Sequence, residues 1–264
     1  MMKARFVRPV PLLFSALLAA LCLGNAYAGG VETIRIGTEG DYPPFSELKP
    51  DGTLVGFDID IARALCDTMK VECEIVQQDW DGIIPALLAG KFDAIFSAVS
   101  VTPERKKKVA FTDKYMSVPA VLVVPKDSDI ASITDEALRG KVVGAQTTTT
   151  FARYAAAHLP DAQLKLYQTP QDFEQDLVNG RLDAIIDDKV VLSDWLKSDQ
   201  GACCKLLGTY PIDLNIFGPG MAGALRKGDT ALLKWFNEAL ATIRQNGTYK
   251  RINDKYFDFD VYGD

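Results

Sequence analysis

Residues 100–105 combine the residue types that bind a carboxylate group. Thr102 can cap a helix and Pro103 can occupy its first position, so free backbone N–H groups would point out of the helix start. Such N–H groups, together with the positive end of the helix dipole, bind anions. Arg105 can add a bidentate clamp, with Ser100 beside it as a further donor. The segment therefore predicts a carboxylate site.

An ammonium group needs the opposite chemistry, which Asp188 and Ser97 offer as an acidic partner and a neutral acceptor. The four consecutive threonines of residues 147–150 precede a second predicted helix and supply more hydroxyl and amide donors. Tyr42 and Trp80 are aromatics beside predicted strand ends, where they can lie against the rest of a ligand. A carboxylate site beside an ammonium site predicts a small zwitterionic ligand.

Each assignment has a simpler alternative. Arg105 begins the basic run of residues 105–108, and such runs usually form solvated helix faces. Asp187 or Asp188 can serve only to cap a following helix. The two aromatics can be packing residues, and the threonines can be a cap and a turn.

Other chemistries have little support in the sequence. Residues 218–223 match G-x-G-x-x-G in letters, but the residues that follow do not read as the start of a helix, so a dinucleotide site is not expected. His158 is the only histidine and has neither metal-ligand nor catalytic-triad spacing. We expect no metal, no cofactor and no catalytic group.

The candidate residues follow four predicted strands. The loops after these strands are residues 38–45, 97–105, 146–151 and 187–189. In open α/β sheets, ligands bind beyond the carboxyl ends of the strands. The four loops would therefore enclose a cleft.

An internal repeat suggests how the strands are grouped. The segment GKFDAI at residues 90–95 recurs as GRLDAI at residues 180–185, each time after a helical pattern and before a short apolar strand. The pattern can also be a common helix-to-strand connector, but we favour two related β-α-β lobes. Strand-like residues 118–124 and Gly-rich residues 217–223 look like two crossings between the lobes.

The helical patterns complete an α/β architecture. Apolar residues recur on one face between Phe57 and Met69, which predicts a helix that packs on a sheet. Asp229 or Thr230 can start a helix that runs through Ile243, and a second helix is expected over residues 248–256. We expect the first lobe to comprise residues 29–118 plus 221–264, and the second lobe residues 119–220.

The N-terminus has the three parts of a secretory signal. Three basic residues precede an apolar run at 12–23, and an A-x-A site follows at 26–28. We therefore expect residues 1–28 to be a signal peptide, since the run is too short for the roughly 20 residues of a membrane span. Cleavage would change the formal net charge from −6 to −9, because three basic residues are lost. An acidic protein is not expected to bind nucleic acid.

Four cysteines follow the signal segment. A bridge between Cys66 and Cys73 would staple a helix to the next strand, whereas the adjacent Cys203 and Cys204 can pair with each other, stay reduced or pair elsewhere.

Taken together, the motifs resemble those of bacterial periplasmic solute-binding proteins for polar amino acids, especially the lysine/arginine/ornithine and histidine branch. The likeness spans essentially the whole mature chain. It rests on the order and number of short motifs at residues 36–39, 42–45, 56–60, 80–85, 93–95, 226–229 and 255–263.

The resemblance implies a type II periplasmic binding protein fold whose two lobes close on the ligand. It also implies a disulfide between Cys66 and Cys73, a periplasmic location and delivery of the amino acid to the membrane permease of an ABC transporter. We expect a monomer without enzymatic activity. The alternative is a periplasmic enzyme of the same fold, similar to the dehydratases that act on arogenate or prephenate.

The resemblance also implies residue roles. It places Arg105, Ser100 and Thr150 on the ligand α-carboxylate, Ser97 and Asp188 on the α-ammonium, Tyr42 and Trp80 beside the ligand side chain, and Glu39 on a distal cation. Thr149 and Ala98 complete the expected binding set, although Ala98 stands where close relatives often have a second Ser.

Two further departures from the family pattern are Thr148, where Gly is usual, and Phe151, where some basic-ligand members have Gln. Glu39 favours arginine, lysine or ornithine, because an unpaired buried carboxylate would be costly. Another polar amino acid or an opine remains the alternative ligand.

Overall fold

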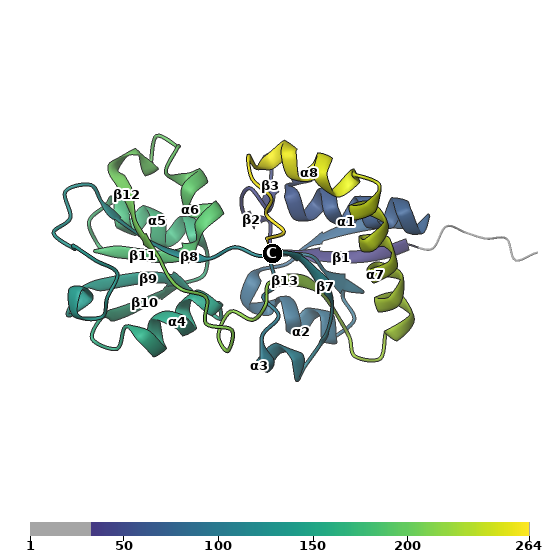
Figure 1. Cartoon of the computed structure of the whole chain (residues 1–264), viewed down its shortest axis with the longest axis horizontal. Helices are drawn as coiled ribbons and strands as arrows, with labels where there is room; N and C mark the ends of the chain where they lie inside the picture. Colours follow the sequence, from purple (N-terminus) through teal and green to yellow (C-terminus); the bar gives the residue numbers. More distant parts are fainter. Residues whose placement is uncertain (1–32, 264) are drawn as a thin grey trace, which may run out of the picture. The chain divides into compact units, whose positions relative to one another are not determined.

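The computed structural model describes residues 33–263, which form two five-stranded sheets flanked by helices (Figure 1). The signal segment expected over residues 1–28 lies outside the described residues. The first sheet has the order β5 (Glu72–Gln77), β1 (Thr33–Thr38), β6 (Ala94–Ile95), β13 (Met221–Leu225) and β7 (Ala110–Met116). The second has the order β10 (Gln163–Tyr167), β9 (Val142–Gln146), β11 (Ala184–Asp188), β8 (Ala120–Pro125) and β12 (Cys204–Thr209).

The two sheets follow one plan. In the first, β1 pairs in parallel with β5 and β6, and β13 pairs antiparallel with β6 and β7. In the second, β9 pairs in parallel with β10 and β11, and β8 pairs antiparallel with β11 and β12. This common plan agrees with the two related lobes predicted from the internal repeat.

The repeated aspartate does the same work in both sheets. The Asp93 carboxylate accepts the backbone N–H of Arg35 at 3.1 Å, and the Asp183 carboxylate accepts that of Val142 at 2.7 Å. In return, the Asp93 N–H donates to the Arg35 carbonyl, and the Asp183 N–H donates to the Val142 carbonyl. The repeated motif therefore joins a helix end to a neighbouring strand, β1 in the first sheet and β9 in the second.

The apolar residues of the repeat pack on glycines of the neighbouring strands. Phe92 lies against Gly37, where an added Cβ would come within 2.5 Å of its ring. Leu182 lies against Gly144 at the equivalent distance of 2.5 Å. The repeat thus encodes side-chain packing as well as a turn.

Helices cover both faces of the first sheet. The predicted helix between Phe57 and Met69 is confirmed as α1, which packs with α7 and α8 on one face. The bounds are α1 (Phe57–Met69), α7 (Thr230–Gln245) and α8 (Thr248–Tyr256), with α2 (Ile83–Leu88) and the one-turn α3 (Pro103–Lys106) elsewhere in this lobe. Side chains of α2 form a separate cluster with Ile95, Val99 and Ala224, and this cluster covers the other face of the sheet.

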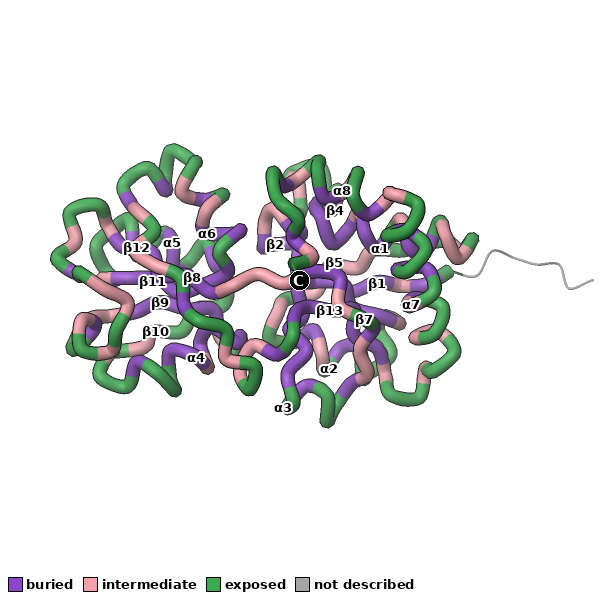
Figure 2. The backbone as a smooth tube through the Cα atoms, in the orientation of Figure 1, coloured by how far each residue is buried: buried purple, intermediate pink, exposed green. Residues whose placement is uncertain are grey.

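The three central strands of the second sheet, β9, β11 and β8, are buried along almost their whole length (purple in Figure 2), whereas the edge strands β10 and β12 are largely exposed or half-buried. In β8, Val121 and Val123 join one core cluster, while Ala120, Leu122 and Val124 join another, as the two-residue period of a strand requires. The helices of this lobe are α4 (Thr150–His158), α5 (Pro170–Val178) and α6 (Lys189–Trp195).

The chain passes between the two sheets from β7 to β8 and again from β12 to β13. The Gly-rich residues 218–223 lead into β13 and not into a helix, as expected. The small sheet of β2 (Asp41–Tyr42), β3 (Ser46–Leu48) and β4 (Leu54–Val55) follows β1.

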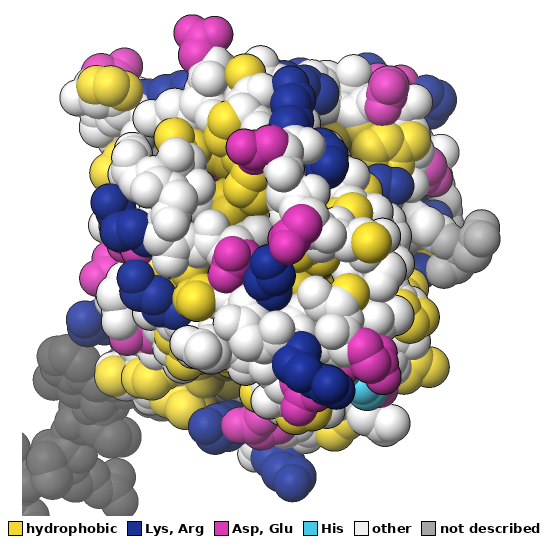
Figure 3. All heavy atoms as spheres, turned by 90° about the vertical axis from the view of Figure 1, so that its left-hand side faces the viewer, with side chains coloured by type: hydrophobic (Ala, Val, Ile, Leu, Met, Phe, Trp, Pro, Cys, Tyr) yellow, Lys and Arg dark blue, Asp and Glu magenta, His cyan; other side chains and the backbone are white. Residues whose placement is uncertain are grey.

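Exposed charges of both signs are interspersed on the face drawn in Figure 3. Surface ion pairs such as Arg139 with Asp161 at 2.8 Å are largely exposed, so each contributes little to stability. Within residues 33–263, no helix has both the length and the apolar character needed to span a membrane.

The structure contains the disulfide between Cys66 and Cys73, which links α1 to β5. It also pairs the adjacent Cys203 and Cys204. Replacing Cys66 and Cys73 by alanine should lower the free energy of unfolding by about 2 kcal/mol, because a short loop constrains the unfolded chain only modestly. Urea denaturation of the variant and the wild type would measure the difference. Equal unfolding midpoints and slopes would contradict the prediction.

Candidate functional site

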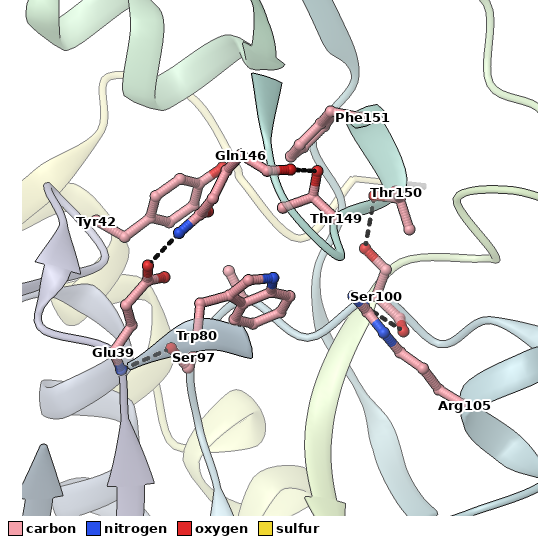
Figure 4. Close-up of a pocket in the computed structure, with 11 residues that line it drawn as sticks. Glu39, Tyr42, Trp80, Ser97, Ser100, Arg105, Gln146, Thr149, Thr150 and Phe151 are labelled. Atoms are coloured by element: carbon pink, nitrogen blue, oxygen red, sulfur yellow. Dashed lines mark hydrogen bonds between the residues drawn. The ribbon is translucent and has the colours of Figure 1, made fainter. Parts of the chain in front are cut away.

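The carboxyl ends of four strands supply the residues of one pocket or its immediate surroundings. Glu39 follows β1, Ser97 follows β6, Gln146 ends β9 and Asp188 ends β11. The empty space between its lining side chains amounts to about 290 Å³, which includes space open to solvent. Its lining is Glu39, Tyr42, Trp80, Ser97, Ala98, Ser100, Arg105, Gln146, Thr149, Thr150 and Phe151 (Figure 4).

The structure brings together nine of the ten predicted binding residues, all except Asp188. Both lobes contribute, because residues 39–105 belong to the first sheet's part of the chain and residues 146–151 to the second's. The strand-end rule thus located the pocket, while the role of each residue stays a prediction.

Arg105 is held rigidly at one side of the pocket. The guanidinium donates from Nη1 to the Ser100 carbonyl at 3.2 Å and from Nη2 to the Thr148 carbonyl at 3.3 Å, and it lies 5.1 Å from the centre of the Trp80 ring. Burial lowers the pKa of Arg105 to about 10, so the group stays protonated at neutral pH. The solvated helix face considered for Arg105 is therefore wrong, although the lysines at 106–108 are exposed.

The helix starts around Arg105 and Thr150 form as predicted. Thr102 accepts the N–H of Arg105 at 3.1 Å, and Pro103 is the first residue of α3. Thr149 caps α4 by accepting the N–H of Ala152 at 3.1 Å. Because α3 is only four residues long, the charge of Arg105 outweighs the helix dipole as the source of anion affinity.

Glu39 lies at the other side of the pocket in Figure 4 and is only 3% exposed. Its backbone N–H donates to the Ser97 hydroxyl at 3.0 Å, and its carboxylate accepts a hydrogen bond from the Gln146 amide. Burial raises the pKa of Glu39 to about 8, a shift that the Gln146 amide opposes and the neighbouring Asp187 increases. A cation in the pocket would therefore have a buried carboxylate as its partner.

Asp187 and Asp188 are fully buried and are not among the residues that line the pocket. The Tyr42 hydroxyl donates to Asp187 Oδ1 at 2.7 Å, which joins the two lobes directly. Asp188 caps α6 by accepting the N–H groups of Val190 at 2.7 Å and Val191 at 3.4 Å, so the capping alternative is confirmed. Its second oxygen, Oδ2, is buried and has no hydrogen-bond partner among the described residues.

A buried chain of polar groups supports the pocket floor. Asp58 accepts the Tyr115 hydroxyl at 2.8 Å, and this hydroxyl accepts the N–H of Ala98 at 3.2 Å. Ala98 has a positive φ of 49°, which the fixed N–H helps to hold. Burial raises the pKa of Asp58 to about 7. The motif at residues 56–60 contains Asp58 but does not by itself indicate this supporting role.

Gln146 and Phe151 line the pocket in addition to the predicted set. Both fall in a loop that the strand-end rule selected, so that rule alone could have identified them. His158 lies on α4 beside Asp213 at 3.2 Å, half exposed. No group of three or more His, Cys, Asp or Glu side chains suited to a metal ion occurs in residues 33–263.

A two-lobed α/β fold with a polar pocket lined by both lobes is the architecture of a small-solute receptor. The model of the bacterial extracellular solute-binding proteins, family 3, matches residues 34–259, and the chain belongs to this family. The sequence is 46% identical over 257 residues to the L-arginine-binding protein of Pseudomonas aeruginosa, covering 94% of this chain and 98% of that protein. It is 40% identical over 260 residues to the histidine-binding periplasmic protein of Escherichia coli, covering 97% and 100%.

Solved structures agree with the fold. An ancestral arginine-binding protein bound to arginine superposes with a TM-score of 0.79 at 36% identity, covering 85% of this chain and 98% of that one. The type II fold expected from the sequence is therefore confirmed. The relatives named above all carry the names of binding proteins.

Proposed function

We propose that this protein binds a basic amino acid, namely arginine, lysine or ornithine, in the periplasm and delivers it to the permease of an ABC transporter. The observation that carries the proposal is the pairing of a buried cation, Arg105, with a buried carboxylate, Glu39, across one small pocket. A ligand with a carboxylate at one end and a cation at the other would neutralise both. The names of the similar proteins support the same ligand class.

The proposed contacts use the polar groups in and around the pocket. Arg105, Ser100 and Thr150 hold the α-carboxylate, with the Ser100 and Thr150 hydroxyls 3.4 Å apart. Thr149 and Ala98 line the pocket beside these groups. Ser97 accepts from the α-ammonium, and the unpartnered Oδ2 of Asp188 is the acidic group proposed for it. Tyr42 and Trp80 flank the ligand side chain, whose cation reaches Glu39.

Binding is proposed to proceed by closure of the two lobes, residues 29–118 plus 221–264 and residues 119–220. Several direct bonds between these parts support this proposal. Examples are Tyr42 to Asp187 at 2.7 Å and Arg153 to Glu104 at 2.9 Å. Such bonds would form only when the lobes meet, so they add to the ligand contacts in the closed state.

Arginine, lysine and ornithine should raise the melting temperature of the protein, because a ligand that binds only the folded state stabilises it. Glutamate should have no effect, since Glu39 would face a second carboxylate. A thermal-shift screen of the common amino acids and opines, followed by calorimetry of those that respond, measures this. A response to glutamate alone would refute the basic-ligand proposal.

A second function, catalysis on the same scaffold, has one observation in its favour. A buried carboxyl group with a pKa of about 8, such as Glu39, is suited to act as a general acid near neutral pH. We nevertheless propose binding without reaction. Incubation with arogenate and prephenate, followed by product analysis, should return both compounds unchanged, and formation of an aromatic product would reverse this choice.

A further inference from the structure

Gln146 is the last residue of β9, and its side-chain amide has a fixed orientation in the pocket. Its Nε2 donates to Glu39 Oε1 and to the backbone carbonyl of Gln168 at 2.9 Å. Both partners are acceptors, so the NH₂ group must face them and the amide cannot be reversed. The amide carbonyl, Oε1, is then left as an acceptor.

The Gln146–Glu39 bond joins the two lobes at the anionic end of the pocket. Glu39 comes from the first sheet's lobe and Gln146 from the second's. The bond occupies one Glu39 oxygen, and within residues 33–263 no donor engages the other, Oε2. When Glu39 is ionised, closure of the lobes therefore leaves two acceptors at this end, Glu39 Oε2 and Gln146 Oε1.

No other side chain of the second lobe's pocket wall can supply an acceptor at this place. Phe151 is apolar and packs against Phe217 with ring centres 6.0 Å apart. The Thr149 hydroxyl donates to the backbone carbonyl of Gln146 at 2.7 Å and accepts the N–H of Ala152 at the start of α4. Thr150 faces Ser100 at 3.4 Å, on the side of the pocket where Arg105 lies.

We propose that Gln146 determines specificity at the distal end of the site, the end where Glu39 lies. Gln146 orients Glu39 and adds an acceptor there. The closed pocket thus selects a cation with several N–H donors over a neutral group of the same shape. The inference rests on the proposed function and extends it to a residue of the second lobe. A guanidinium carries five N–H donors and no acceptor, whereas the ureido group of citrulline places a carbonyl oxygen in one of those positions. Above pH 8, where Glu39 is ionised, that oxygen would face two acceptors and be repelled, so the two ligands are compared at such a pH.

The test compares arginine with citrulline, which share their α-groups and differ only at the distal end. Gln146→Leu removes the amide and keeps a similar volume. Arginine binding should weaken about 10- to 100-fold, as expected for lost hydrogen bonds around a charged group, while citrulline binding should change less than about threefold. The arginine-to-citrulline preference, measured by calorimetry, should therefore fall at least about tenfold.

The matched control is Gln168→Leu. Gln168 is exposed, and it contacts Gln146 only through its backbone carbonyl, so this variant should retain the wild-type preference. An equal loss of arginine and citrulline binding in Gln146→Leu would overturn the inference, because Gln146 would then act only on the general shape of the site. Unchanged binding of both would overturn it as well. Wild-type protein that binds neither ligand would instead refute the proposed function, and this inference with it.

Discussion

Replacing Arg105 by alanine is expected to abolish measurable amino-acid binding while the protein stays folded. The ligand carboxylate would lose two charge-assisted hydrogen bonds, each of which contributes about 1.5–3 kcal/mol, so the affinity should fall about 10²- to 10⁴-fold. In the wild type the Arg105 cation is only 9% exposed and lies 5.1 Å from the centre of the Trp80 ring. Calorimetry with arginine would measure the change.

Two further variants separate binding from folding. Arg105→Lys keeps the positive charge but not the planar fork, so part of the affinity should return. Arg139→Ala removes a surface arginine whose partner, Asp161, lies in the same lobe, and its affinity should stay within a few-fold of the wild type. Circular dichroism and the melting temperature would confirm that each variant is folded. Wild-type affinity in a folded Arg105→Ala protein would remove Arg105 from the site.

The pocket could be located from the sequence because it depends on short-range features. The repeated Gly-basic-apolar-Asp-Ala motif fixes where each strand begins, through the bonds from Arg35 to Asp93 and from Val142 to Asp183. Once the strands are placed, their carboxyl ends follow. Parallel pairing then brings those ends to one edge of each sheet.

The features that were not predicted depend on long-range contacts. Gln146 acts on Glu39, which lies 107 positions away in the sequence. Asp58 is buried within α1 because Tyr115, on a distant strand, supplies its partner. Helical periodicity cannot reveal such a partner, since it reports only which face of a helix is apolar.

Asp188 shows a third kind of limit. The sequence allowed either a helix cap or a ligand contact, and one oxygen does cap α6 while the other remains without a partner. A carboxylate has two oxygens and about four acceptor positions, so the two roles are compatible. The two interpretations were therefore not true alternatives.

Replacing Glu39 by glutamine should weaken arginine binding about 10²- to 10³-fold at pH 8, because the distal cation would be buried without its counter-ion. The amide is nearly isosteric with the carboxylate, so packing and the contact with Gln146 should change little. Citrulline, which has no distal charge, should lose much less affinity. Calorimetry with both ligands tests this, and an equal loss for both would show that Glu39 does not meet the ligand cation.

The affinity for arginine should also fall as the pH is lowered from 8 to 6. The pKa of Glu39 in the empty pocket is about 8, so the group is mostly protonated below that pH. The ligand cation favours the ionised form, and binding must then release a proton. Each pH unit below 8 should cost about 1.4 kcal/mol, up to tenfold in affinity, for as long as Glu39 stays ionised in the complex.

The Glu39→Gln variant is also the control for this pH dependence. Burial raises the pKa of Asp187 and of Asp58 to about 7, so both can titrate in the same window and contribute to the wild-type curve. Their contribution persists in the variant, whereas that of Glu39 is lost. The difference between the two pH profiles thus isolates Glu39, and its slope should approach one proton released per arginine bound between pH 6 and 7. Parallel profiles would mean that Glu39 is already ionised in the empty pocket, or that the cation binds elsewhere.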